Sequence, residues 1–291
     1  MIPGSFDYHA PTTVEEAIGL LARHGAGAKL LAGGHSLIPA MRFRLAQPET
    51  LIDLNRIPGL DALREDGGHL VIGALTREVA IEDSGLVRTR YPLLADTSAV
   101  VADPLVRNRG TVGGNLAHAD PANDHPAAML AYGAELIAQG SAGRRTIAID
   151  DFFTEFFESA LAADEVLIEI RIPAPGKGAG GAYLKLERKV GDYAISAVAV
   201  QLVMDGKTCR EARIGLTNVN PVPMRATGAE AAVAGKELTD QVLEAAGKAA
   251  AAQCDPSTDL RGGVDYKRDV TRVLTKRALR KAAERARGGA A

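Results

Sequence analysis

The chain has 291 residues, a hydrophobic content of 46% and a formal net charge of -2. This length fits about two domains, and the near-neutral charge gives no electrostatic reason to expect a nucleic-acid partner. No apolar stretch approaches the roughly 20 residues that cross a bilayer, and the N-terminus has neither the basic start nor the apolar core of a signal peptide. We therefore expect a cytoplasmic protein without a transmembrane segment.

The cysteines and histidines argue against the common metal centres. Cys209 and Cys254 lie far apart and form no Cys-x-x-Cys pair, whereas an iron–sulfur cluster takes four ligands, mostly thiolates. His118 and His125 are seven residues apart, which is a poor spacing for metal ligands on one helix. The sequence predicts no metal site, so any redox chemistry requires an organic cofactor.

The first half of the chain predicts a mixture of helices and strands. An amphipathic helix follows Pro11, with Thr12 or Thr13 as its cap and Gly25 at its end. Apolar runs then predict strands at 28–34, 49–57, 69–76, 135–140, 143–153 and 165–173, and helices at 77–101 and 124–136.

A Pro/Gly cluster at 173–181 predicts a linker. It contains a G-x-G-x-x-G pattern, but a strand-like segment follows where a dinucleotide site needs a helix. Behind it, strands are predicted at 181–189, 194–206 and 209–219, with a turn at Asp205-Gly206, and helices at 227–235, 240–253 and 264–287.

The predicted fold class is α+β with two domains. Residues 1–175 form the first domain, with subdomains of about 1–56 and 57–175. Residues 176–291 form a C-terminal domain with a three-stranded antiparallel sheet and helices. No internal repeat is visible in the chain.

Two glycine-rich loops carry the candidate site. Successive glycines let the backbone approach a ligand and point consecutive N–H groups into one concavity, which binds anions. Two ordinary tight turns are the alternative, but the same pattern occurs twice between apolar segments. Together the loops predict a pyrophosphate site. They are AGGHS and TVGGN, consisting of Ala32, Gly33, Gly34, His35 and Ser36, and of Thr111, Val112, Gly113, Gly114 and Asn115.

Single residues near these loops have competing interpretations. Ser36, Thr111 and Asn115 add side-chain donors, whereas His35 could equally be satisfied within its own loop. Asp124, ten residues after Gly114, could accept a hydrogen bond from a ribose hydroxyl, or it could cap the helix that follows.

As a combination, these motifs resemble the FAD-binding medium subunit of the molybdenum hydroxylases. The resemblance covers essentially the whole chain and includes DPLVRNRG before the second loop, NLAHADPAND after it, and LKLERKVGDYAISAVAV, GLTNVNPVPMRA and YKRDVTRVLTKRAL farther on. The carbon monoxide dehydrogenase type looks most similar, and the flavin domain of xanthine dehydrogenase is a more distant relative.

The resemblance implies a fold and a cofactor site. The first domain would be a vanillyl-alcohol-oxidase (PCMH) type FAD-binding domain of two α+β subdomains, and the later domain would close over the flavin. Both glycine loops would contact the FAD pyrophosphate, with Asp124 near the ribose and Tyr193 against the isoalloxazine ring. Lys185 is a further candidate flavin contact. The alternatives are a half-buried strand aromatic for Tyr193 and a solvated strand position for Lys185.

The resemblance also implies an oxidoreductase whose substrate is oxidised elsewhere. A molybdopterin centre on a large subunit would oxidise the substrate, and [2Fe–2S] clusters on a small subunit would pass the electrons to FAD here and on to an external acceptor. The complex would be a dimer of heterotrimers, and this chain would need no catalytic acid or base of its own. Two alternatives remain, a self-sufficient flavin oxidase or reductase and a cofactor-free assembly subunit.

The C-terminal helix at 264–287 is rich in Lys and Arg. A solvated amphipathic helix whose late cations complement its own dipole is the simpler interpretation. Docking of this helix to a partner subunit is the second hypothesis.

Overall fold

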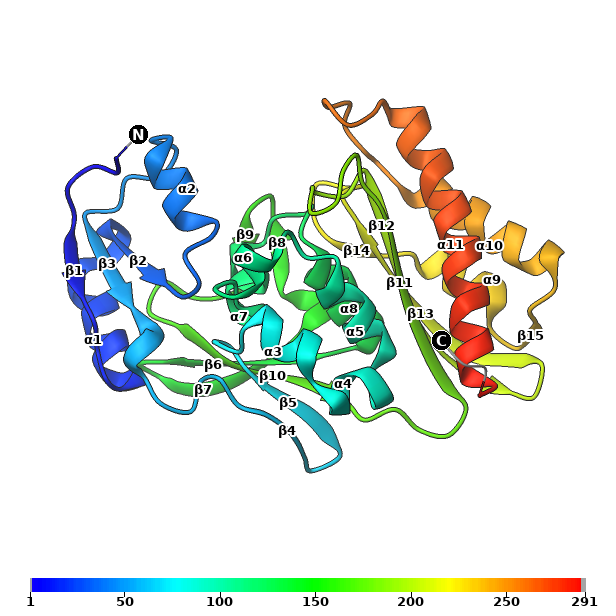
Figure 1. Ribbon diagram of the computed structural model, residues 1–291, viewed down its shortest axis with the longest axis horizontal. Coiled ribbons are helices and arrows are strands. Elements are labelled where there is room, and N and C mark those ends of the chain that lie inside the picture. Colours follow the sequence, from blue (N-terminus) through cyan, green and yellow to red (C-terminus); the bar gives the residue numbers. More distant parts are fainter. Residues whose placement is uncertain (1, 289–291) are drawn as a thin grey trace.

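The computed structural model describes residues 2–288; residue 1 and residues 289–291, at the outer ends of the two predicted domains, lie outside it. Three sheets follow one another along the long axis of the molecule in chain order, and a small hairpin of β8 (Phe153–Glu155) and β9 (Glu158–Ser159) lies against one of the helices that follow the second sheet's first strands (Figure 1).

The first sheet is parallel and is covered by one amphipathic helix. Thr13 caps α1 because its hydroxyl accepts the backbone N–H of Glu16, as predicted, and Ala17, Ile18 and Leu21 enter the core. The strand order is β1-β3-β2. The elements are β1 (Asp7–His9), α1 (Val14–His24), η1 (Gly25–Gly27), β2 (Ala28–Leu31), α2 (Leu37–Arg42), β3 (Thr50–Asp53) and η2 (Leu54–Arg56).

The second sheet is antiparallel, with the order β4-β5-β10-β6-β7. Its strands are β4 (Leu63–Asp66), β5 (His69–Gly73), β6 (Glu135–Gly140), β7 (Gly143–Ala148), which leads into η3 (Ile149–Asp151), and β10 (Val166–Pro173). The helices between β5 and β6 are α3 (Glu78–Asp83), α4 (Gly85–Arg90), α5 (Pro92–Ala99), α6 (Pro104–Arg107), α7 (Val112–His118) and α8 (Asp124–Tyr132).

The stretch 77–101 is largely helical, as predicted, and it divides into the three helices α3, α4 and α5. Ser84 ends α3 and caps α4, because its hydroxyl accepts the N–H of Val87. Pro92 then starts α5, where its missing N–H costs nothing.

The C-terminal sheet has three long strands, as predicted, and two short ones that the sequence did not indicate. Gly206 turns the predicted hairpin with φ of 57°. The predicted linker is shorter than expected, because β10 runs to Pro173 and the next strand starts at Ala179. The elements are β11 (Ala179–Leu186), β12 (Ser196–Asp205), β13 (Thr208–Thr217), β14 (Met224–Arg225), α9 (Thr227–Val233), β15 (Lys236–Glu237), α10 (Asp240–Gln253) and α11 (Val264–Ala286).

This sheet separates two cores because successive strand residues point to opposite faces. In β12, Ala197 and Ala199 pack with the buried helix α8 of the preceding part of the chain, whereas Val198 and Val200 pack with α10 and α11. Figure 1 shows α10 and α11 on the outer side of this sheet. The inner face therefore joins the two parts of the molecule.

The basic helix α11 uses most of its charge within the chain. Asp96 of α5 accepts hydrogen bonds from Lys281 at 3.1 Å and from Arg285 at 2.7 Å, which ties α11 to α5. The other cations of α11 that pair with carboxylates outside the helix are Lys267 with Asp259, Arg272 and Lys276 with Glu244, and Arg280 with Asp240. Docking of this helix to a partner stays a prediction, and these six cations are already engaged.

None of the helices within residues 2–288 combines the length and the apolar character needed to cross a membrane. Cys209 and Cys254 are buried free thiols.

Candidate functional site

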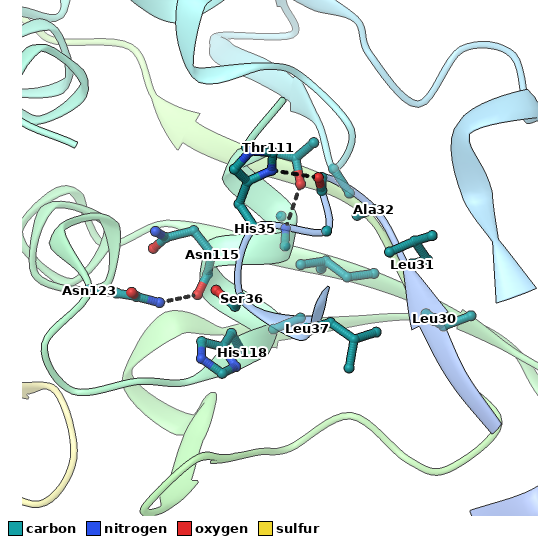
Figure 2. A pocket seen from close by; sticks show the side chains of 18 of the residues that line it. Leu30, Leu31, Ala32, His35, Ser36, Leu37, Thr111, Asn115, His118 and Asn123 are labelled. Carbon is teal, nitrogen blue, oxygen red and sulfur yellow. Dashed lines mark hydrogen bonds between the residues drawn. The ribbon is translucent and has the colours of Figure 1, made fainter. Parts of the chain in front are cut away.

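A cavity of about 760 Å³ is lined by residues from all three parts of the chain, that is, from those that carry the first, the second and the C-terminal sheet. Its walls come from the loop after β2, the start of α7, and a loop at 187–195 of the C-terminal part. Figure 2 shows the first two of these, with His35 and Ser36 facing Thr111 and Asn115. This volume is within the ~300–1,000 Å³ range of ligand sites.

The first predicted loop, 32–36, has the expected open backbone. All five of its residues line the cavity. Gly34 has φ of 77°, a left-handed conformation that favours glycine. His35 is satisfied within the loop, because its Nδ1 lies 2.9 Å from the carbonyl oxygen of Gly33. Among the residues that the structure describes, no acceptor lies within hydrogen-bond reach of the N–H groups of 33–37, so this loop offers a row of donors.

The second predicted loop, 111–115, is the capped start of α7, so the expectation of free N–H groups there is wrong. Gly113 donates its N–H to the carbonyl of Ala74, Gly114 to the hydroxyl of Thr111, and Asn115 to the carbonyl of Thr111. The N–H of Val112 is likewise bonded, to the carbonyl of residue 76. Glycine is needed at position 113 because a Cβ there would lie 2.6 Å from the Ala74 carbonyl oxygen.

The side chains of this segment divide between the cavity and the core. Thr111, Gly113, Gly114 and Asn115 line the cavity, whereas Val112 is fully buried in the core of the second part and does not. The Oδ1 atom of Asn115 is buried and has no partner within the described chain. The unpartnered Oδ1 of Asn115 can only accept, so the side-chain donors of this segment are the Thr111 hydroxyl and the Nδ2 amide of Asn115, while the backbone donors come from the first loop.

Asp124 and Lys185 form a buried ion pair on the cavity wall. The Lys185 ammonium donates to Asp124 Oδ2 at 3.0 Å and to the carbonyl of Val100 at 3.0 Å, and the Tyr183 hydroxyl donates to Asp124 Oδ1 at 2.6 Å. Burial raises the pKa of Asp124, opposed by the Lys185 cation. Asp124 does not cap α8, whose N-cap is Asn123, so that alternative is wrong. Lys185 is not solvated either, with 3% of its side chain exposed.

Tyr193 lies on the cavity wall with 43% of its surface exposed. The guanidinium of Arg261 lies 5.5 Å from the centre of its ring and also donates to Asp192 at 2.8 Å. This hydrogen bond lowers the pKa of Asp192 to about 2. Arg261 thus fixes the loop that carries Tyr193 and covers one side of the tyrosine ring. Tyr193 sits in this loop, outside the strands, so the half-buried strand aromatic of the alternative does not describe it.

Two further cavity residues were not identified from the sequence. His118, at the end of α7, lies with its ring centre 5.1 Å from that of Phe157. Burial lowers the pKa of His118. Phe157 adopts φ of 60° in the turn between β8 and β9, which is uncommon for a bulky residue. No local pattern predicts this contact, since the two residues belong to different elements.

The cavity combines donors for an anion with apolar walls. Backbone and hydroxyl donors line part of it, and apolar side chains such as Leu30, Leu54 and Leu167 line another part. Within residues 2–288, no cluster of three or more His, Cys, Asp or Glu side chains could hold a metal ion. The donors are those of an organic phosphate site rather than a metal centre.

Comparisons with known proteins agree on one family across the chain. Residues 4–175 match the family model "FAD binding domain in molybdopterin dehydrogenase", and residues 181–282 match "CO dehydrogenase flavoprotein C-terminal domain". The chain is 49% identical to the carbon monoxide dehydrogenase medium chain of Hydrogenophaga pseudoflava, over 96% of this chain and 97% of that one.

Solved structures give the same result. The structure of carbon monoxide dehydrogenase from Hydrogenophaga pseudoflava, in a form that lacks the Mo-pyranopterin moiety, matches with a TM-score of 0.96 and 50% identity over 98% of this chain and 99% of that one. Quinoline 2-oxidoreductase from Pseudomonas putida 86 matches with a TM-score of 0.92 and 34% identity over 98% and 99%.

Proposed function

The chain belongs to the family of FAD-binding medium subunits of the molybdenum hydroxylases, and from this premise we propose that it holds FAD in the cavity between the two glycine loops and passes electrons through it. The resemblance, the fold class and the cofactor class expected from the sequence are confirmed by the comparisons. The chain is a subunit of an oxidoreductase.

The single observation that carries the assignment of the site is the row of N–H groups at 33–37 on the cavity wall, which have no hydrogen-bond partner within residues 2–288. In this proposal these donors bind the pyrophosphate of FAD, and the side chains of Thr111 and Asn115 bind it from the other side. Such a concave set of N–H groups favours an anion without a nearby cation.

The remaining predicted residues bind other parts of the cofactor. Asp124 faces the ribose with the lone pairs that Tyr183 and Lys185 leave free. Lys185 contacts Asp124 at 3.0 Å and is therefore placed beside it, as the further candidate contact to the flavin. Tyr193 lies against the isoalloxazine ring, and this placement is supported by its exposed ring in the cavity wall with Arg261 on one side. Val112 contributes to the site only through the backbone of α7.

The chemistry is that of the cofactor, since FAD when bound accepts two electrons and releases them to an acceptor. The protein positions the flavin, limits its contact with water, and leaves one edge within reach of a partner. In this proposal the chain needs no catalytic acid or base of its own.

The Hydrogenophaga pseudoflava relative is a medium chain and is therefore part of a multi-subunit enzyme. We propose that the partners of this chain are a molybdopterin-containing large subunit and a [2Fe–2S] small subunit, assembled as a dimer of heterotrimers. The substrate is chosen on the large subunit, so carbon monoxide and nitrogen heterocycles such as quinoline are both compatible with this chain. A cytoplasmic location remains a prediction.

Anaerobic mixing tests the electron-transfer role. The FAD-loaded full chain is mixed with its partner iron–sulfur subunit, which has been reduced with dithionite and separated from the excess. We expect the visible absorbance of the flavin to bleach as it accepts electrons. A flavin that stays oxidised beside the reduced partner would contradict the role, and turnover of a small organic substrate by the chain alone would favour a self-sufficient oxidase.

A further inference from the structure

A polar contact behind the cavity connects the two glycine loops. Asn55 lies in η2, directly after β3, and its side-chain amide donates to the carbonyl of Ala32 at 2.9 Å. The same amide is oriented by Asp53, whose Oδ1 accepts both the backbone N–H and the side-chain N–H of Asn55. Asn55 therefore holds the first residue of the first loop.

Arg77 extends this contact to the second loop. Its guanidinium donates through Nη2 to the side-chain oxygen of Asn55 and through Nη1 to the carbonyl of Arg109, two residues before Thr111. The backbone of Arg77 also forms an isolated antiparallel bridge with Thr111. One planar side chain thus connects the support of the first loop to the segment that leads into α7.

The carbonyl of Arg109 is the point where the two loops touch. A Cβ on Gly33 would lie 2.4 Å from this oxygen and 2.9 Å from the Cα of Gly110. The loops are therefore in van der Waals contact at Gly33, and the position of the Arg109 carbonyl sets their separation.

The guanidinium of Arg77 donates its hydrogen bonds to neutral acceptors. Within the described chain it forms no ion pair, and both of its hydrogen bonds go to a carbonyl or amide oxygen. Burial lowers the pKa of Arg77, and the neighbouring Arg109 cation adds to this shift. A partly buried cation with these partners adds little through charge pairing, whereas its rigid fork suits the bridging of two fixed oxygens.

We propose that Asn55 and Arg77 are positioning residues that fix the spacing of the two glycine loops and thereby set the preference of the chain for a pyrophosphate over a single phosphate. Neither residue lines the cavity, so they act through the loops and not through contact with the cofactor. This inference rests on the proposed FAD site. A pyrophosphate bound from both sides depends on the spacing, whereas a single phosphate can rest on the first loop alone.

The test compares FAD and FMN binding to the full apo-chain by flavin fluorescence titration. Arg77→Lys keeps the charge but replaces the fork with a single ammonium that cannot bridge both oxygens. Asn55→Asp keeps an oxygen for Arg77 but removes the N–H that holds Ala32. Arg64→Lys is the matched control, because Arg64 pairs with Asp66 on the surface and 53% of its side chain is exposed.

We expect both variants to weaken FAD binding by about tenfold, the effect of roughly one lost hydrogen bond, while FMN binding and the control stay at the wild-type values. The ratio of the FAD affinity to the FMN affinity is the decisive readout. If Asn55 and Arg77 had a purely structural role, the variants would have a lower melting temperature but the same affinity ratio. Suppose that the wild-type chain prefers FAD and that the variants bind FAD and FMN with the same affinity ratio as the wild type. This result would overturn the inference about Asn55 and Arg77 and would leave the proposed FAD site intact. A wild-type chain that binds neither flavin, or both equally, would overturn the proposed site as well.

Discussion

The contact between Gly33 and the second loop gives the sharpest stability and binding prediction. Gly33→Ala adds one Cβ, which would lie 2.4 Å from the Arg109 carbonyl oxygen, below the 3.0 Å that real Cβ contacts require. The backbone must move by the difference of at least 0.6 Å. Because φ of Gly33 is not positive, the effect is steric and involves no strained conformation.

Overpacking of this kind typically costs about 1–3 kcal/mol. In the apo-chain the two loops can separate and relieve most of it, whereas the pyrophosphate of FAD requires their native spacing. The cost therefore falls on binding, and at about 1.4 kcal/mol per factor of ten it corresponds to an FAD dissociation constant raised roughly 5- to 100-fold.

Fluorescence titration of the apo-chain with FAD measures this change, and thermal unfolding of the same samples measures the fold. Gly176→Ala is the matched control, because its Cβ would meet nothing within 4 Å and its φ is not positive. We expect the control to bind FAD as the wild type does. A Gly33→Ala chain with unchanged FAD affinity would refute the close approach of the two loops.

Two predictions concern buried charges. Asp124→Asn removes the carboxylate of the buried Lys185 pair, so we expect the free energy of unfolding to fall by roughly 3 kcal/mol in urea denaturation; a loss no larger than that of a surface variant would contradict the pairing. Burial lowers the pKa of His125, but Glu78, with Oε2 2.6 Å from Nε2, outweighs it and raises the pKa. The contribution of this pair is complete below the unfolded value of about 6.5 and is lost as pH rises through the raised value. The stability difference between the wild type and His125→Gln should therefore shrink with rising pH, and a constant difference would contradict the charged pair.

Local patterns were sufficient where neighbouring residues decide the structure. The cap at Thr13, the hairpin turn at Gly206 and the long strands of the C-terminal sheet were all predicted, because capping, turn chemistry and apolar runs are properties of short segments. The short strands β14 and β15 were missed, since two residues carry no period that could be recognised.

The loops were recognised by their composition, but their hydrogen bonds could not be read from it. Whether the N–H of Gly113 points to a ligand or to the Ala74 carbonyl depends on a residue 39 positions earlier in the chain, directly after β5. The same applies to Arg261 over Tyr193 and to Arg77 behind the loops, since these contacts join segments far apart in sequence. Only folding brings these segments together, so no local sequence pattern predicts the contacts between them.

The identity and amount of the flavin bound by the purified full chain test the central claim most directly. We predict a visible flavin spectrum after incubation with FAD, one FAD per chain after removal of the excess, and much weaker retention of FMN. A folded chain that retains no flavin, or that retains FMN as well as FAD, would contradict a pyrophosphate site formed by the two glycine loops.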